Sequence, residues 1–225
     1  MNTIDISELE ETIGYVFKDK ELAKLALTHS SYSNEMKINK YGNYERLEFL
    51  GDAVLELVSS LFFYEKYPQK NEGELTRLRS SMVCEMSLAY CAREFGLQNY
   101  ILLGKGEEAT HGRDRDSIVS DVFEALLGAI YLDSGFETAQ KFVISHVMKD
   151  LENKQLFYDA KTILQERVQS EGKTLVYELA KEEGPDHDKR FTVNAIIDNE
   201  VCAVGTGKSK KSAEQQAAYE ILKKK

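Results

Sequence analysis

Apolar residues recur along the first two thirds of this chain with the spacing of helices, and the period then shortens to that of strands. In residues 44–64 the apolar positions fall three or four apart, as on the buried face of an amphipathic helix. Residues 116–131 are more apolar still and predict a helix in the core. Residues 175–179 alternate apolar and polar side chains, which indicates a half-buried strand. A helical part followed by a mixed part is therefore expected.

Cap and turn signals complete the predicted elements. Further helices are expected from Ser7 onward and at 21–27, 75–95, 137–151, 161–170 and 211–222, with strands at 175–179, 191–197 and 201–205. Residues 33–43 and 100–116 are expected to be irregular, and His29 to close the helix at 21–27. The fold class is an all-α domain over 1–150, a polar linker over 151–159, and a small α+β domain over 160–225 in the order α-β-β-β-α.

Two acidic residues stand on one face of the helix predicted for residues 44–64. Glu48 and Asp52 are four apart, where like charges repel and cost a helix about 0.2–0.5 kcal/mol. One interpretation is a solvated carboxylate face, which this pair alone favours. The other is a cation held between the two side chains, either an Arg, a Lys or a metal ion.

The helix predicted for residues 116–131 shifts the preference toward a bound cation. Asp121 and Glu124 are three apart within it, so they also share a face. Carboxylates in a core helix are costly unless they are paired or bind a metal. Oxygen donors without a neighbouring His or Cys suit a hard cation, and Mg²⁺ or Mn²⁺ fits them better than Zn²⁺.

Composition and charge narrow the class of protein. The 225 residues are 42% hydrophobic and 30% charged, as in an ordinary globular protein. No apolar run approaches the ~20 residues of a membrane helix, and the acidic N-terminus lacks a signal-peptide core. We therefore expect a cytoplasmic protein with no membrane partner. The net charge of −9 belongs to residues 1–157, while residues 158–225 are neutral and hold lysine clusters at 208–211 and 223–225.

Three partial motifs do not meet the requirements of their classes. Residues 104–109 fit G-x-G-x-x-A, but no helix is predicted directly after them, as a dinucleotide site requires. Glu108 and His111 form a single E-x-x-H, whereas a di-iron bundle needs two on helices. Residues 207–209 would end a P-loop, but Cys202 stands where that motif needs glycine. No nucleotide cofactor is predicted, and the three cysteines form no C-x-x-C.

Two acidic segments resemble the signature of bacterial ribonuclease III. They are Glu45-Arg46-Leu47-Glu48-Phe49-Leu50-Gly51-Asp52-Ala53-Val54-Leu55 and Asp121-Val122-Phe123-Glu124-Ala125-Leu126-Leu127-Gly128-Ala129. The residues after 160 resemble the double-stranded RNA-binding domain, through Gly184-Pro185-Asp186-His187 and the segment 205–218. The resemblance implies the ribonuclease III endonuclease fold over 1–150, with catalysis and dimerisation, and an RNA-binding domain over 160–225.

The resemblance also implies an activity. It is the Mg²⁺-dependent hydrolysis of double-stranded RNA to 5′-phosphate and 3′-hydroxyl ends with short 3′ overhangs, in the processing of ribosomal RNA precursors and other structured RNAs. Mn²⁺ is expected to substitute for Mg²⁺. The implied metal ligands are Glu48, Asp52, Asp121 and Glu124, of which Asp52 and Glu124 are the catalytic residues. Further acidic family positions of second rank are Glu45, Glu72 and Glu107, each of which also fits a salt-bridge partner.

The partners implied by the resemblance are double-stranded RNA and a second copy of the chain. RNA contacts are expected from Thr162, Gln165, Glu166, Pro185, His187, Lys208, Ser209, Lys210 and Lys211. The homodimer is expected to bury Phe49 and Leu50. Three alternatives remain open: an inactive RNA-binding regulator, a structural helical protein with an RNA-binding tail, and an unrelated metal-dependent nucleotide hydrolase. The first is expected to have lost an acidic residue, the second does not need the carboxylate pairs, and the third leaves residues 160–225 unexplained.

Overall fold

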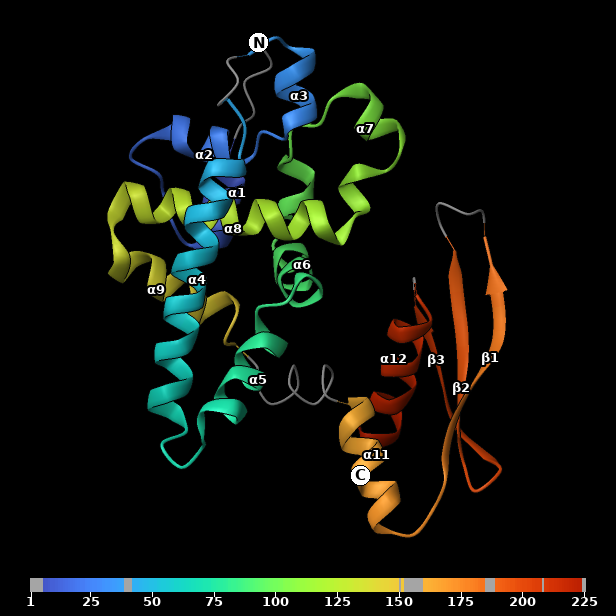
Figure 1. Ribbon diagram of the computed structural model, residues 1–225. Coiled ribbons are helices and arrows are strands. Elements are labelled where there is room, and N and C mark those ends of the chain that lie inside the picture. Colours follow the sequence, from blue (N-terminus) through green and yellow to red (C-terminus); the bar gives the residue numbers. More distant parts are fainter. Residues whose placement is uncertain are drawn as a thin grey trace. The chain divides into compact units, whose positions relative to one another are not determined.

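The chain forms two compact units, Met1–Lys149 and Asp150–Lys225. The structure is a computed structural model that describes residues 6–38, 42–149, 151, 160–184, 189–207 and 209–223 (Figure 1). The helices described in the first unit are α1 Ser7–Ile13, α2 Lys20–Ala26, α3 Ser30–Glu35, α4 Glu45–Lys66, α5 Glu72–Met82, α6 Glu85–Glu94, η1 Leu97–Tyr100, α7 Lys105–Ala109, η2 Gly112–Asp114, α8 Asp116–Ser134 and α9 Phe136–His146. The second unit contains α11 Ala160–Ser170, β1 Leu175–Glu183, β2 Arg190–Ile197, β3 Glu200–Gly207 and α12 Lys210–Lys223. The predicted fold class is confirmed.

Helix α8 is the centre of the first unit. It packs against α2, α4, α6 and α9, and eleven of its nineteen residues are buried. Its apolar sequence explains this position, because a helix that is apolar on most sides is stable only when it is surrounded. Phe123 contributes to an aromatic cluster, with its ring centroid 6.1 Å from that of Phe95 and 5.6 Å from that of Phe142. The cluster joins α8 to α9 and to the end of α6.

Helices α4 and α8 cross in close contact (Figure 1). A Cβ added at Gly51 of α4 would lie 1.8 Å from the backbone oxygen of Glu124. A Cβ added at Gly128 of α8 would lie 2.2 Å from the backbone oxygen of Leu47. The two helix backbones therefore touch, and only glycine fits at both positions. Glycine inside a helix costs about 1 kcal/mol relative to alanine. Both glycines therefore destabilise their own helices but allow the backbones of α4 and α8 to come into contact.

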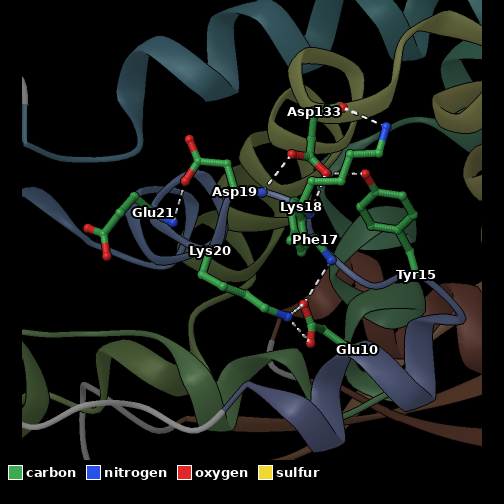
Figure 2. A network of polar contacts seen from close by, with 8 residues as sticks. All are labelled: Glu10, Tyr15, Phe17, Lys18, Asp19, Lys20, Glu21 and Asp133. Atoms are coloured by element: carbon green, nitrogen blue, oxygen red, sulfur yellow. Dashed lines mark hydrogen bonds and ion pairs between the residues drawn. The ribbon is translucent and has the colours of Figure 1, made fainter.

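A polar network holds the C-terminal end of α8 to the segment that joins α1 and α2 (Figure 2). The carboxylate of Asp133 accepts hydrogen bonds from the Tyr15 hydroxyl and from the backbone N–H groups of Lys18 and Asp19, the latter two at 2.9 Å. These hydrogen bonds lower the pKa of Asp133, although burial acts in the opposite direction. The network fixes the end of the central helix to this segment.

The second unit is a three-stranded antiparallel sheet of order β1-β2-β3 that packs against two helices. Asp198 and Asn199 have φ values of 49° and 69°, as in the type I′ turn of a hairpin. A Cβ at Gly205 of β3 would lie 2.1 Å from the backbone oxygen of Ala213, so β3 approaches α12 as closely as α4 approaches α8. An ion pair between Lys161 and Glu214 joins α11 to α12.

Several local predictions are wrong in detail. The single helix predicted for 75–95 is two helices, α5 and α6, and Cys84 is the N-cap residue of the second. His29 does not close α2 but opens α3, where its Nδ1 accepts from the backbone N–H of Ser31. Residues 105–109 form the short helix α7 within the segment that was expected to be irregular. Each error concerns short or interrupted elements, whose sequence pattern spans too few turns to decide between helix and loop.

We predict that Gly51→Ala destabilises the first unit by about 3 kcal/mol or more, the upper range for overpacking, because the added methyl group overlaps the backbone of Glu124. Urea unfolding followed by circular dichroism measures the loss. Gly106→Ala in α7 is the matched control, since a Cβ there meets nothing within 4 Å and should change stability by less than about 1 kcal/mol. Equal midpoints for the two variants would contradict the close approach of α4 and α8.

Candidate active site

The crossing of α4 and α8 brings four of the predicted carboxylates to one region of the first unit. Glu48 and Asp52 flank Gly51 on α4, and the backbone oxygen that Gly51 approaches belongs to Glu124. Asp121 lies one turn earlier on α8. The glycine contact thus fixes the register of the two helices at the level of the acidic residues.

Burial and mutual repulsion raise the pKa of two glutamates in this group. The pKa of Glu124 is raised to about 8 by burial and then by the charges of Asp52, Asp121 and Glu48. The pKa of Glu48 is raised to about 7 by burial and then by Asp121, Glu45 and Asp52. Both groups therefore hold protons near neutral pH, because desolvation and like charges disfavour the ionised form. The coupling also shows that the acidic side chains of α4 and α8 lie within electrostatic range of each other.

Asp121 has a raised pKa as well, chiefly because it is half-buried. The hydroxyl of Tyr44 lies 3.4 Å from its Oδ2 and donates to it, which acts against the rise. Burial also raises the pKa of Tyr44, followed in effect by the charges of Asp121 and Glu48. Tyr44 is the residue directly before α4, so this contact links the start of one acidic helix to the carboxylate of the other.

The four carboxylates fit a hard divalent cation by their chemistry. They offer only oxygen donors, and within the described part of the chain none of them forms an ion pair. The raised pKa values of Glu48, Asp121 and Glu124 are what partly buried carboxylates without a cation are expected to have. Among the described residues no three His, Cys, Asp or Glu side chains converge into a ready-made metal site. Like-charge repulsion opposes such convergence until a cation offsets it.

The three acidic residues of second rank lie in different surroundings. Glu45 is exposed at the first turn of α4 and contributes to the raised pKa of Glu48. Glu107 on α7 pairs with Arg115, 2.6 Å away, so a salt-bridge role already accounts for it. Glu72 begins α5 and lines the same hollow as Ser60 and Tyr64 from the C-terminal half of α4. Within one copy of the chain, Glu72 is thus not brought to the four carboxylates.

The residues predicted to contact RNA belong to the second unit. Thr162, Gln165 and Glu166 are exposed and share one face of α11, since they are spaced i, i+3 and i+4. Lys210 and Lys211 are exposed in the first turn of α12. The Ser209 hydroxyl accepts from the backbone N–H of Ser212 at 3.1 Å and so caps α12. Pro185, His187 and Lys208 lie outside the described residues.

An apolar stripe with an adjoining hollow runs along α4. Phe49, Leu57 and Tyr64 expose 80%, 57% and 71% of their surface, and at about 100° per residue they fall within about 80° of one another around the helix. Leu50 beside Phe49 is half-buried. The hollow lies between α4 and α5, has a volume of about 580 Å³, and is lined mainly by Leu57, Leu61, Phe63, Tyr64 and Leu75. Large apolar side chains exposed together mark an interaction surface.

Two features of the site escape sequence reasoning. One is the contact between Tyr44 and Asp121, which joins residues 77 positions apart and leaves no periodic signal. The other is the role of Gly51 and Gly128. A sequence signal for these existed, because glycine within a strongly helical pattern usually has a packing reason.

Comparisons with known proteins agree on one family. The family model described as "Ribonuclease-III-like" matches residues 19–151, and the model described as "Double-stranded RNA binding motif" matches residues 160–225. The chain is 47% identical over 218 residues to Ribonuclease 3 of Bacillus cereus strain G9842, covering 96% of this chain and 89% of that protein. It is 46% identical over 220 residues to Ribonuclease 3 of Bacillus licheniformis, covering 96% and 88%.

A solved structure resembles the first unit. It is the nuclease domain of ribonuclease III from Campylobacter jejuni, described with structural flexibility in a region involved in dimer formation. The two are 42% identical, with a TM-score of 0.61 and coverage of 65% of this chain and 98% of that one. Among the described residues, no helix has the length and apolar character that crossing a membrane requires.

We predict that the metal-free protein loses stability as the pH rises from about 5 to 8. In that window Glu48 and Glu124 keep protons in the folded state that the unfolded chain has released, so the free energy of unfolding falls by up to about 1.4 kcal/mol per pH unit for each proton. Glu124→Gln should flatten the fall and raise the stability at pH 8. Urea unfolding in a chelator at several pH values measures both effects.

The matched control is Glu11→Gln, which changes an exposed carboxylate on α1. It should leave the pH dependence of unfolding as it is in the wild type. A Glu124→Gln protein with the wild-type pH profile would show that Glu124 does not titrate in this window.

Proposed function

The chain belongs to the ribonuclease III family, and on that premise we propose that Glu48, Asp52, Asp121 and Glu124 hold the Mg²⁺ with which it hydrolyses double-stranded RNA. It is an endoribonuclease specific for double-stranded RNA, because both the nuclease family and the RNA-binding motif are present. Enzymes of this family are metal-dependent, and the oxygen-only donor set favours Mg²⁺, with Mn²⁺ as a substitute. The observation that carries the proposal is the meeting of two acidic pairs at the Gly51–Gly128 contact, where Glu48, Asp121 and Glu124 are partly buried.

The carboxylates determine how the site takes up a cation. Because Glu48 and Glu124 hold protons near neutral pH, binding a cation displaces these protons, and the affinity rises with pH. Asp52 and Glu124 are the catalytic pair in this proposal, one from each helix. Mg²⁺ held by these residues would lower the pKa of bound water and stabilise the charge on the leaving oxygen, which suits 5′-phosphate and 3′-hydroxyl products. The rigid crossing keeps the ligands of α4 and α8 in one register.

The second unit supplies affinity for the duplex. Thr162, Gln165 and Glu166 present side chains to 2′-hydroxyls of a minor groove, and Lys210 and Lys211 contact phosphates. Pro185, His187 and Lys208, which lie outside the described residues, are proposed contacts on the grounds of the family motif alone. Ser209 belongs to this set through the helix start that it caps, because backbone N–H groups there favour phosphate. The ion pair of Lys161 with Glu214 keeps the two helix faces together.

We propose a homodimer formed by the apolar stripe of α4. In a two-fold dimer each surface meets its own copy, so Phe49 of one chain can enter the hollow between α4 and α5 of the other. Phe49 and Leu61 are twelve residues apart, about 18 Å along the helix at 1.5 Å per residue, so the axis would cross α4 between them. Two sites would then cut both strands and leave short 3′ overhangs. The cellular task we propose is the cytoplasmic processing of ribosomal RNA precursors and other structured RNAs, including messenger and transfer RNA precursors.

Cleavage by Glu124→Gln tests the proposed site. The substitution keeps the size of the side chain and the helix but removes an anionic ligand, so cleavage of long duplex RNA at ordinary Mg²⁺ should fall by about two orders of magnitude or more. Binding of the same RNA in a chelator should remain. Gel assays of cleavage and binding, with single-stranded RNA and duplex DNA as controls, measure both. Near wild-type cleavage at limiting Mg²⁺ would remove Glu124 from the ligand set.

A double variant, Lys210→Ala with Lys211→Ala, tests the proposed RNA contacts of the second unit. It should weaken binding equally for all duplex sequences and flatten the dependence of affinity on salt by roughly one unit per lost phosphate contact. Its stability and metal response should stay those of the wild type. A variant of either kind that loses binding, cleavage and cooperative unfolding together would indicate a structural role instead.

For the dimer, we predict that Phe49→Glu yields a monomer in sedimentation velocity at micromolar concentration, whereas the wild type sediments as a dimer. A charge in an apolar hollow would have to be desolvated without a partner. The control is Val16→Glu, since Val16 is 68% exposed but lies outside the apolar stripe. A wild-type monomer, or a dimer of the Phe49 variant, would exclude this interface.

A further inference from the structure

Tyr44 is anchored at the edge of the candidate active site more firmly than a helix cap requires. Only 4% of its surface is exposed, although it directly precedes α4. Its backbone N–H donates to the Thr28 oxygen at 2.9 Å, and its ring centroid lies 5.6 Å from that of His29. Thr28 and His29 are themselves joined to Leu102, through a bridge and a 3.1 Å hydrogen bond to its backbone oxygen. Tyr44 is therefore held both by its backbone hydrogen bond to Thr28 and by the contact of its ring with His29.

The hydroxyl of this buried ring is directed at one of the four carboxylates. It lies 3.4 Å from Oδ2 of Asp121. Within the described part of the chain, no other side chain donates a hydrogen bond to Glu48, Asp52, Asp121 or Glu124. A distance of 3.4 Å is long for an O–H···O bond, whose usual range is about 2.5–3.0 Å. Such contacts are commonly long in unloaded active sites and tighten in the loaded form.

We propose that Tyr44 is a positioning residue whose hydroxyl orients the carboxylate of Asp121 for the divalent cation, an inference that rests on the function proposed above. Asp121 is a carboxylate with acidic neighbours on both α4 and α8. It repels Glu48 and Glu124, as their raised pKa values show, and Glu85 of α6 repels it in turn. A donor on Oδ2 holds the side chain against this repulsion and leaves Oδ1 for the cation.

Partners of this kind are known to matter for metal affinity. Hydrogen bonds from outer groups to ligating carboxylates fix the ligand's orientation, and their loss typically costs 10–100-fold in metal affinity or activity. Because the contact here is long, we expect the lower end of that range. Tyr44→Phe removes only the hydroxyl and keeps the ring that packs on His29, so it isolates this contact.

The test measures Mn²⁺ binding directly, by electron paramagnetic resonance or calorimetry, on the full chain. Tyr44→Phe should raise the dissociation constant for Mn²⁺ about tenfold and raise the Mg²⁺ concentration for half-maximal cleavage to the same extent. Cleavage at saturating Mg²⁺ should remain near that of the wild type, because a positioning residue acts through the ligand. In an Asp121→Asn background, Tyr44→Phe should add nothing further to the loss of affinity.

Tyr15→Phe is the matched control. It removes a tyrosine hydroxyl that donates to Asp133, an aspartate on the same helix α8 but twelve residues from Asp121, about 18 Å along the axis (Figure 2). It should lower stability and leave Mn²⁺ binding unchanged. Equal losses of Mn²⁺ affinity in the two tyrosine variants would overturn the proposal, because they would reflect a general loosening of α8.

The remaining outcomes are also decisive. Wild-type Mn²⁺ binding by Tyr44→Phe would overturn the positioning role while leaving the proposed function intact. Wild-type Mn²⁺ binding by Glu124→Gln would instead count against the metal site itself. Circular dichroism and urea unfolding accompany each variant. A Tyr44→Phe chain that does not fold cooperatively would assign the hydroxyl to the fold and overturn the proposal.

Discussion

The backbone contact between α4 and α8 is the constraint on which the first unit depends. Gly51 and Gly128 let the two helices touch at a point where any side chain would collide with a carbonyl oxygen. Each glycine costs its helix about 1 kcal/mol, and the close packing of a buried central helix outweighs that cost. The consequence is chemical, because the residues beside this contact include Glu48, Asp52 and Glu124. A wider separation of the helices would place the acidic pairs in two sites instead of one.

The same contact brings negatively charged side chains close together. The site gathers carboxylates that burial and mutual repulsion drive toward protonation, as the raised pKa values of Glu48 and Glu124 show. Elsewhere in the unit acids are satisfied by local hydrogen bonds. Asp133 accepts two backbone N–H groups and a hydroxyl, and Glu10 accepts from the N–H of Phe17 and from Lys20 (Figure 2). The contrast separates acids that stabilise the fold from the acids for which we propose a cation.

The second unit also contains a close backbone contact that only glycine allows. Gly205 lets β3 lie directly against α12, where Ala213 and Ala217 offer no side chain to obstruct it. The helix is thereby set close to the sheet with its lysine-bearing first turn exposed. Duplex RNA is read largely by shape, so in the RNA contacts proposed above the spacing of α11 and α12 matters as well as the side chains. The two acidic pairs lie in the first unit, and the exposed Lys210 and Lys211 lie in the second.

The sequence by itself determined the residue types at the site, the helical and mixed halves of the chain, and the pairing of acids on two helix faces. Period and spacing carry that information, since each depends on residues a few positions apart. Only the tertiary structure decided which faces meet. It placed Tyr44 on Asp121, paired Glu107 with Arg115, and kept Glu72 beside the far half of α4. These contacts join residues distant in the chain, and they follow from how close two backbones can approach, which no local pattern records.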